Sequence, residues 1–305
     1  MKISIIVLNW KRFEETRDCI SSLQSLKVTK DAEVSIIVVD NNSGDGSAEK
    51  LRKLKKSTFP VEVIANTHNY GFAGGNNVGM KYAMNNLADY IMVLNNDTRV
   101  HPELLQELLN VFSSKDVGVA SPKIYFEKGY EYHKDRYTKA EHGKVIWYAG
   151  GDIDWNNIYG SNRGVDEIDE GQYDEVRELD FATGACFLIS RKAVTKAGFF
   201  DERYFMYLED VEYSQRIQKK GLKILFAPKA KLWHKVAQSS AIGSGLNDYF
   251  LSRNRLFFAK RYASERARFA LFRESLKFML LGREWQRKGV IDYYKNNMGK
   301  GSWQN

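Results

Sequence analysis

Short apolar runs alternate with amphipathic stretches along the first third of the chain. The apolar runs predict strands, whereas the amphipathic stretches repeat with the period of a helix. Strands that alternate with helices indicate an α/β fold with a mostly parallel sheet and right-handed crossovers. The expected elements are a strand at 3–8, a helix ending at 26, a strand at 34–40, a helix at 48–56, a strand at 61–65, a helix from about 74 to 86 and a strand at 90–94.

The middle of the chain is less regular. Residues from about 125 to 180 combine many charges with glycine pairs and aromatic side chains, which predicts a long, partly ordered excursion from the sheet. Regular elements then return, and the final part of the chain, after His234, is helical and basic. The elements expected after the excursion are a strand at 181–190, helices at 192–197 and 209–219 and a strand at 224–227, with Gly221 ending the second helix.

One apolar run, 90–94, ends abruptly in the polar residues Asn95, Asn96 and Asp97. A continuous apolar run predicts a strand that is buried on both faces, and ligands of open α/β sheets bind beyond the carboxyl ends of such strands. Mg²⁺ is usually held by one or two carboxylates together with substrate phosphates, so Asp97 is a candidate ligand for a metal-bound nucleotide. Alternatively these residues form only a turn, because their side chains hydrogen-bond to the local backbone.

Two other segments could contact a nucleotide. Asp40 ends the second expected strand, and its carboxylate could accept a hydrogen bond from the N3–H of uracil or thymine. The segment 69–77, NYGFAGGNN, places small residues before a helix, where backbone can approach phosphate, although a flexible turn is the alternative. The glycine patterns of Rossmann and P-loop sites, GxGxxG and GxxxxGK[ST], do not occur at the required places.

Three carboxylates occur within four residues at the expected helix start, at Glu209, Asp210 and Glu212. They could simply compensate the helix dipole. The aromatic residues of 199–207 could instead enclose a carboxylate and raise its pKa toward that of a general base, which makes Asp210 or Glu209 a catalytic candidate. His234 could complete a metal site with Asp97, although a single histidine is more often a packed or surface residue and imidazole is softer than the usual Mg²⁺ ligand.

The net charge of +8 belongs to the end of the chain. Residues 236–305 contain 13 Lys or Arg and 5 Asp or Glu, whereas residues 1–235 contain 33 of each sign. The two cysteines, Cys19 and Cys186, form no disulfide or zinc pattern and favour a reducing compartment. Neither a signal peptide nor an apolar segment of roughly 20 residues is found, so we expect a cytoplasmic protein, soluble or peripheral to the membrane.

Seven motifs, in this order, resemble those of the family 2 inverting glycosyltransferases, and most closely the bacterial rhamnosyltransferase-like branch. They are SIIVLNW, VVDNNSGDGS, NYGFAGGNN, VLNNDT, TGACFLISRKA, GFFDERYFMYLEDVEYSQR and a final WHK. The resemblance covers about residues 4–234 and continues weakly through 249–258. It implies a GT-A fold for the catalytic domain, which we expect in residues 1–235. The charge and residue pattern predict a basic, amphipathic helical region in residues 236–305.

The resemblance also implies roles for individual residues. Leu8 and Asn9 would border the nucleotide base and Asp40 would recognise it. The sequence at 95–97 stands where the family has DxD but begins with asparagine, so Asp97, helped by His234, would hold Mg²⁺ or Mn²⁺. The residues expected to contact the nucleotide are Leu8, Asn9, Asp40, Asn42, Gly74, Asn77, Asn95 and Asn96.

The expected reaction also follows from the resemblance. Asp210, the second acid of its motif, would take the proton from an acceptor hydroxyl as that oxygen attacks the anomeric carbon, so one displacement would invert the configuration. The metal would offset charge on the leaving diphosphate. Glu209 would orient the acceptor or donor sugar. Processive relatives carry QxxRW and membrane helices, which this sequence lacks, so transfer of one or a few sugars is expected.

The expected donor is dTDP-rhamnose or a UDP-sugar, and the expected acceptor is a glycan or a polyprenyl-diphosphate-linked glycan of a surface polysaccharide. The basic and aromatic tail could lie on an anionic membrane at the inner face of the cell membrane, or pack on the catalytic domain. Because Asn95 weakens the metal motif, a catalytically inactive sugar-nucleotide-binding or scaffold protein is the alternative. Nucleic-acid binding is not expected, because the catalytic part is neutral and carries no recognised motif.

Overall fold

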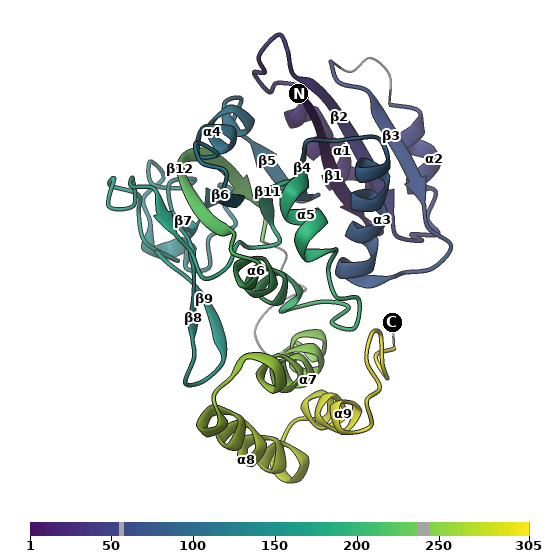
Figure 1. Cartoon of the computed structure of the whole chain (residues 1–305), viewed down its shortest axis with the longest axis vertical. Coiled ribbons are helices and arrows are strands. Elements are labelled where there is room, and N and C mark those ends of the chain that lie inside the picture. Colours follow the sequence, from purple (N-terminus) through teal and green to yellow (C-terminus); the bar gives the residue numbers. More distant parts are fainter. Residues whose placement is uncertain (55–57, 237–243, 305) are drawn as a thin grey trace.

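The structure, a computed structural model, describes residues 1–54, 58–236 and 244–304, and within these ranges a mixed sheet of ten strands is covered by helices (Figure 1). The strands are β1 Lys2–Asn9, β2 Glu33–Asp40, β3 Val61–Ala65, β4 Tyr90–Asn95, β5 Thr98–Val100, β6 Val117–Phe126, β7 Ile146–Tyr148, β8 Gly151–Asp154, β9 Tyr159–Asn162, β10 Arg177–Glu178, β11 Cys186–Ser190 and β12 Lys223–His234. The helices are α1 Phe13–Leu23, α2 Ser47–Arg52, α3 Gly71–Asn85, α4 Leu104–Asn110, α5 Arg191–Ala197, α6 Glu209–Lys219, α7 Gly245–Tyr262, α8 Glu265–Leu281 and α9 Glu284–Tyr294, with a 3₁₀ turn at Lys134–Arg136.

The first half of the chain forms the parallel part of the sheet. β1 pairs in parallel with β2 and β4, and β2 pairs in parallel with β3. Residues 3–7 of β1 are all buried, as are residues 36–40 of β2, because helices lie over both faces. The expected α/β fold with a mostly parallel sheet is therefore confirmed, and β3 occupies the predicted residues.

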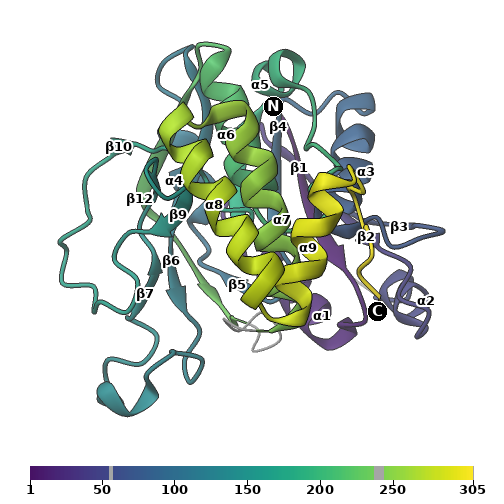
Figure 2. The same ribbon diagram turned by 90° about the horizontal axis from the view of Figure 1, so that it is seen from below.

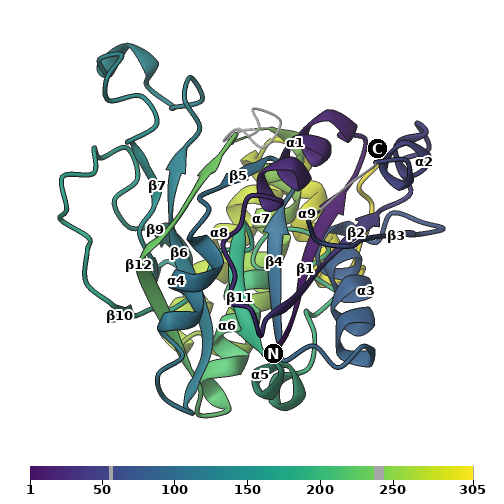
Figure 3. The ribbon, with the colours of Figure 1, turned by 90° about the horizontal axis from the view of Figure 1, so that it is seen from above.

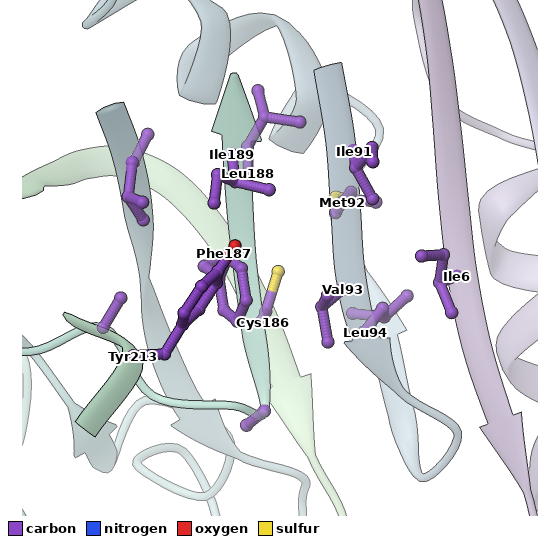
Figure 4. Packing of buried hydrophobic residues seen from close by; sticks show 14 of the residues in the cluster. Ile6, Ile91, Met92, Val93, Leu94, Cys186, Phe187, Leu188, Ile189 and Tyr213 are labelled. Atoms are coloured by element: carbon purple, nitrogen blue, oxygen red, sulfur yellow. The ribbon is translucent and has the colours of Figure 1, made fainter. Parts of the chain in front are cut away.

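The full order of the sheet is β10-β12-β6-β11-β4-β1-β2-β3, with β5 joined to β12 and β7 joined to β6. Seen from above, β4 lies between β1 and β11 (Figure 3). β11 runs antiparallel to both β4 and β6, whereas β12 is parallel to β6. In the core, Leu188 and Met92 are register partners on the antiparallel strands β11 and β4, and Figure 4 shows Ile6 of β1 on the other side of β4 from Leu188.

The prediction of a strand over 181–190 was wrong in its first half. The strand begins at Cys186, because N–H groups before it bond to α6 and β8 instead of continuing the ladder with β4 and β6. The N–H of Ala182 donates to Ser214 Oγ at 3.1 Å, and the N–H of Gly184 donates to the Asp210 carboxylate at 2.8 Å. These bonds leave 181–185 as a loop at the edge of the sheet.

Other boundaries also differ from the predictions. β12 extends to His234 past Pro228, where a register shift between Ala227 and Lys231 accommodates the irregular backbone. α3 begins at Gly71 rather than near Gly74. α2 ends at Arg52 rather than 56, and residues 55–57 lie outside the described residues. β6 and α4 were not predicted, and the excursion begins only after β6, where β7, β8, β9 and β10 confirm its partial order.

The helices α7, α8 and α9 gather at one end of the molecule, with α7 nearest the sheet (Figures 1 and 2). α7 is buried on several sides, and its buried residues include Tyr249, Phe250, Arg253 and Asn254. α8 is far more exposed. α7 therefore packs on the body, as one of the two expectations for the tail has it, while membrane contact by the more exposed α8 stays a prediction. Within the described ranges, none of the helices has both the length and the apolar character needed for a bilayer crossing.

The close approach of α3 to β1 yields a test of this packing. A Cβ atom at Gly79 would lie 2.6 Å from Ile6 Cγ2, so a larger residue there must push the helix off the sheet. We expect Gly79→Val to lower the free energy of unfolding by about 1–3 kcal/mol in urea titrations. Asn85→Val, at an exposed position of the same helix, controls for helix propensity. Equal stabilities of the two variants would contradict the packing described here.

Candidate functional site

Two adjoining pockets lie at the carboxyl ends of the parallel strands. We call the first, of about 750 Å³, the strand-end pocket, and the second, of about 450 Å³, the carboxylate pocket. Phe72 and Met206 line both, so the pockets adjoin. The strand-end pocket is lined by Leu8, Trp10, Lys11, Asn41, Asn42, Ser43, His68, Asn69, Gly71, Phe72, Phe205, Met206, Ser244, Gly245, Leu246, Lys300 and Trp303. Lining residues of the carboxylate pocket include Asn95, Asp97, Tyr132, Trp147, Tyr159, Thr183, Gly184, Glu209, Asp210, His234 and Arg255.

The reversed strand β11 brings the polar residues of the carboxylate pocket together. Its first residue pairs with the end of β4, and the N–H of Asn95 donates to the carbonyl of Ala185 at 2.9 Å. The next residue back, Gly184, donates its N–H to Asp210 Oδ2 at 2.8 Å. Two hydrogen bonds made by neighbouring backbone groups thus connect the end of β4 to the Asp210 side chain in the first turn of α6. Asn95 and Asp210, 115 positions apart in the sequence, therefore line one pocket.

Asp97 and His234 meet because β5 pairs with β12. His234 is the register partner of Thr98, which directly follows Asp97. The His234 Nε2 and Asp97 Oδ1 atoms lie 2.9 Å apart. The imidazole is nearly buried, with its edge against Trp147 at 4.7 Å between ring centroids. Its other nitrogen, Nδ1, is buried without a hydrogen-bond partner among the described residues.

This pair fits a divalent cation that is shared with a ligand. Asp97 would offer a carboxylate oxygen, the type of ligand that Mg²⁺ prefers, and His234 would offer an imidazole nitrogen beside it. The described residues contain no group of three or more His, Cys, Asp or Glu side chains suited to a metal. Asp97 and His234 could therefore hold an ion only together with water or ligand oxygens, such as phosphates.

Glu209 and Asp210 begin α6 and face the same pocket. Burial raises the pKa of Asp210, although N–H groups of Gly184 and Val211, each 2.8 Å from its oxygens, oppose that rise. Burial, and then the nearby charge of Asp210, holds the pKa of Glu209 well above its usual range. The Glu209 Oε2 atom has no hydrogen-bond partner in the described part of the chain. Both acids thus occupy surroundings that favour proton uptake.

The residues predicted to contact the nucleotide divide into two groups. Leu8 and Asn42 line the strand-end pocket and Asn95 lines the carboxylate pocket. The others do not line either pocket as described. They are Asn9, Asp40, Gly74, Asn77 and Asn96.

Asn9 and Asp40 are buried and bond to each other. The Asn9 amide donates to Asp40 Oδ1 at 2.6 Å, and the Ser43 N–H donates to Asp40 Oδ2 at 3.1 Å. The carboxylate therefore stabilises the turn that carries Asn41, Asn42 and Ser43 into the wall of the strand-end pocket. That Asp40 contacts a base stays a prediction.

Gly74, Asn77 and Asn96 also have supporting contacts. Asn77 accepts a hydrogen bond from the N–H of Phe200 at 2.9 Å and donates to its carbonyl at 3.0 Å, which ties α3 to the segment before α6. Asn96 donates to Thr16 Oγ1 at 2.9 Å. A Cβ at Gly74 would meet Tyr70 Cβ at 2.7 Å, so the glycine permits a tight start to α3. Their nucleotide contacts also stay predictions.

Several pocket residues were missed by the sequence reasoning. Lys11 and His68 line the strand-end pocket from two loops, and Lys300 and Trp303 reach it from the other end of the chain. Lys11 comes two residues after the end of the first strand, and this position could have marked it as a ligand for an anion. No local pattern marks Lys300 or Trp303, because only the folding of the C-terminal segment brings them there.

Comparisons with known proteins place the chain in a family. The model of the family described as "Glycosyl transferase family 2" matches residues 4–198. The low-salt glycan biosynthesis hexosyltransferase of Haloferax volcanii is 25% identical over 73% of this chain, and the match spans 63% of that protein. The N-acetylglucosaminyl-diphospho-decaprenol L-rhamnosyltransferase of Mycobacterium tuberculosis is 27% identical, over 72% of each chain. A dTDP-rhamnosyl transferase of Shigella flexneri is 23% identical, over 77% of this chain and 71% of the relative.

Solved structures support the fold. A mannosyltransferase from Pyrobaculum calidifontis, in complex with GDP-Man and Mn²⁺, superimposes with a TM-score of 0.58 at 12% identity, over 99% of this chain and 76% of the other. The structure of GalNAc-T7 with UDP, GalNAc and Mn²⁺ superimposes with a TM-score of 0.59 at 16% identity, over 92% of this chain and 56% of the other. These similarities confirm the expected GT-A fold. Because the family model matches more than half of the sequence, the chain belongs to glycosyl transferase family 2, and its resemblance to the rhamnosyltransferases of that family is confirmed.

Proposed function

We propose that the protein transfers one or a few sugars from a nucleoside diphosphate to a hydroxyl of a glycan or polyprenyl-diphosphate-linked glycan, with inversion at the anomeric carbon. Rhamnose from dTDP-rhamnose is the first candidate and a UDP-linked sugar the second. One observation carries the proposal: a cation-suited pair, Asp97 and His234, and a partly buried acid, Asp210, face one pocket beside the strand-end pocket. The rhamnosyltransferase relatives support the choice of donor.

The donor nucleotide would occupy the strand-end pocket. Lys11, Lys300 and His68 line it and could offset the charge of the diphosphate. The diphosphate would then reach the shared wall at Phe72 and Met206, with the sugar in the carboxylate pocket. Asp97 and His234 would hold Mg²⁺ or Mn²⁺ there, and a bound cation would offset the charge that grows on the leaving diphosphate.

Asp210 would act as the general base. Its Oδ2 and Oδ1 atoms are held by backbone N–H groups, which fixes the carboxylate in the pocket. It would accept the proton of the acceptor hydroxyl while that oxygen forms a bond to the anomeric carbon and the bond to the diphosphate breaks. A raised pKa makes the carboxylate a stronger base than an exposed aspartate. Glu209 would orient the donor or acceptor sugar.

The acceptor would enter past the excursion that follows β6. Tyr132, Trp147 and Tyr159 come from this excursion and line the carboxylate pocket with aromatic surface. Tyr132 and Tyr159 are about half exposed, so they stand at its mouth. A polyprenyl-diphosphate-linked acceptor is supported by the Mycobacterium relative, whose name specifies such a molecule.

The helical region would bring the enzyme to that lipid-linked acceptor. We propose residues 1–235 as the catalytic unit and residues 236–305 as a region that also contacts an anionic membrane at the inner face of the cell membrane. α8 exposes a series of large apolar side chains alongside Arg266, Arg268, Arg273 and Lys277, a mixture that suits an anionic interface. The exposed apolar residues of α8 are Phe269, Phe272, Leu276, Leu280 and Leu281.

A catalytically inactive sugar-nucleotide-binding protein is the second candidate, because Asn95 replaces the first acid of the metal motif. Slow, metal-dependent release of dTDP or UDP from the donor sugar would argue against it. Loss of this release in Asp97→Ala would assign the release to the proposed site.

The base assignment predicts a separation of binding from chemistry. Asp210→Asn keeps the shape of the side chain but cannot accept the proton, so we expect transfer to fall about 100- to 10,000-fold while donor binding is retained. Calorimetric binding and single-turnover transfer measure the two quantities. Asp135→Asn changes an exposed acid in the excursion and should leave both unchanged. Intact transfer by Asp210→Asn would remove Asp210 as the base.

The burial of Glu209 predicts a cost to stability. Because folding raises its pKa, the folded state is penalised once the pH exceeds the pKa of the unfolded chain, and the penalty disappears at lower pH. We expect Glu209→Gln to raise the free energy of unfolding by about 1–3 kcal/mol at neutral pH. Below about pH 4, where the acid is protonated in both states, the gain should vanish.

Urea titrations at the two pH values measure this difference. Glu175→Gln removes an exposed carboxylate and should have no effect at either pH. A Glu209→Gln variant that is no more stable than the wild type at neutral pH would show that the buried charge is not penalised.

If α8 contacts the membrane, its exposed apolar residues should contribute to vesicle binding. Leu280 and Leu281 are 78% and 80% exposed, so their replacement should not disturb the core. We expect Leu280→Ser with Leu281→Ser to weaken binding to vesicles of anionic lipid about tenfold or more. Leu87→Ser, at a residue 67% exposed after α3, is the control. Unchanged sedimentation of the double variant with vesicles would contradict the proposal.

A further inference from the structure

The loop before the two acids has an unusual backbone. Phe205, Tyr207 and Leu208 have φ angles of 63°, 66° and 67°, a left-handed conformation that side chains disfavour. Residues in this conformation persist only where their surroundings hold them. We call residues 204–208 the acid loop, because it leads directly into Glu209 and Asp210. It also lines both pockets, through Phe205 and Met206.

α7 holds one side of the acid loop. Asn254 is fully buried, and its side-chain nitrogen lies within hydrogen-bonding distance of three loop carbonyls, those of Tyr204 at 3.0 Å, Met206 at 2.8 Å and Tyr207 at 2.8 Å. Arg253, also fully buried, donates to the carbonyl of Tyr204 at 3.0 Å. The Arg253 Nε atom donates to Asn254 Oδ1 at 3.0 Å. That bond orients the amide with its nitrogen toward the loop.

α3 holds the other side. The carbonyl of Phe205 accepts hydrogen bonds from the N–H groups of Phe72 at 2.7 Å and Ala73 at 3.2 Å. A side chain at Gly71 would collide there, because its Cβ would lie 2.5 Å from the same carbonyl oxygen. The carbonyls of residues 204–207 are thus all bonded, one to α3 and three to α7. Buried backbone groups need such partners, so the two helices together determine the path of the loop.

We propose that Asn254, oriented by Arg253, is a positioning residue for Asp210: it holds the acid loop so that the first turn of α6 presents the carboxylate to the pocket. The proposal rests on the proposed function, in which Asp210 is the base. It gives the C-terminal helices a part in catalysis that is separate from membrane contact. Neither residue reaches the pocket itself, and the effect passes through the loop backbone.

Substitution of Asn254 separates this role from a general contribution to stability. Asn254→Ala removes the donor to three carbonyls, so the loop can relax and Asp210 can move. Ser252→Ala is the matched control, because Ser252 is buried on the same helix but bonds to carbonyls of Asp248 and Gln286, away from the acid loop. Both variants lose buried hydrogen bonds. Only the first should alter the chemistry.

The assay is release of dTDP from dTDP-rhamnose with Mn²⁺, or of UDP from UDP-glucose if the wild type prefers it, together with calorimetric binding of the nucleotide and thermal melting. We expect Asn254→Ala to lower kcat about 10- to 100-fold, the scale found when a catalytic group is displaced by about 1 Å. Nucleotide affinity should change far less than kcat. Ser252→Ala should keep kcat at the wild-type value whatever its melting temperature.

A pH–rate profile adds a readout that lost stability alone would not change. Water that reaches Asp210 through a relaxed loop would lower its raised pKa, so the acid limb of the profile should move to lower pH in Asn254→Ala. A wild-type kcat and profile in this variant would overturn the proposal. If Asn254→Ala does not fold, Arg253→Lys, which removes the orienting Nε bond, should show the same changes at smaller size, and a wild-type profile there would overturn it equally.

Asp210→Asn, measured in the same assay, distinguishes the two levels of failure. If Asp210→Asn loses activity while Asn254→Ala keeps the wild-type kcat and pH–rate profile, only the positioning role is overturned. Retained activity in Asp210→Asn would overturn the base assignment and, with it, the positioning role. Loss in both, with a shifted profile in Asn254→Ala, supports both.

Discussion

The reversal of one strand, β11, determines where the candidate site of this protein lies. An antiparallel strand between β4 and β6 must begin where β4 ends, so the loop before it lies at the same edge as Asn95. The backbone of that loop accepts a hydrogen bond from the N–H of Asn95 through the carbonyl of Ala185, and donates one to Asp210 through the N–H of Gly184. A parallel strand in this place would have put the same loop at the opposite edge, far from the acids. The antiparallel pairing of β11 with β4 therefore places the residues that line the carboxylate pocket at one edge of the sheet.

The second constraint is electrostatic. Two carboxylates at the start of α6 and a third at Asp97 lie in one pocket, and ionised groups in such a place need compensation. Asp210 receives it from two backbone N–H groups, and Asp97 from His234. Glu209 receives the least compensation, because its Oε2 atom has no hydrogen-bond partner in the described residues, and its pKa is held well above its usual range. This uneven compensation fits a site that binds a cation and a polar substrate, because these ligands supply the missing partners.

The sequence predicted the elements well where the local pattern alone determines structure. β3 and α6 occupy the residues expected, since each has a clear period and a clear end. The strand predicted over 181–190 failed because tertiary bonds from Ala182 and Gly184 to α6 outweigh an apolar pattern that suits a strand. β6 was missed because Gly118, Pro122 and Lys123 interrupt its apolar pattern, and α4 was missed because it is only seven residues long.

The site was predictable to the extent that its residues follow strand ends or carry family motifs. Asp97, His234, Glu209 and Asp210 were singled out in this way, and they line one pocket. Gly74 and Asn77 were expected at the nucleotide for the same reasons, yet their described contacts are with the protein itself.

Long-range contacts explain the residues that were missed. Lys300, Trp303 and Asn254 belong to a region whose sequence shows basic amphipathic helices and nothing about what they touch. Their positions depend on how α7 and the C-terminal segment pack on the acid loop and the strand ends. No periodicity in one segment can report a contact with a segment 50 residues away, such as that of Asn254 with Tyr204.

The most direct test of the account is whether Asp97 and His234 hold a divalent cation beside a nucleoside diphosphate. Thermal melting with dTDP, UDP or GDP, each with and without Mn²⁺, should be measured for the wild type and for Asp97→Ala, because a ligand selective for the folded state raises the melting temperature. We expect strong stabilisation by dTDP or UDP only when Mn²⁺ is present, and loss of that metal-dependent part in Asp97→Ala. Equal stabilisation without the metal, or an undiminished metal effect in Asp97→Ala, would contradict it.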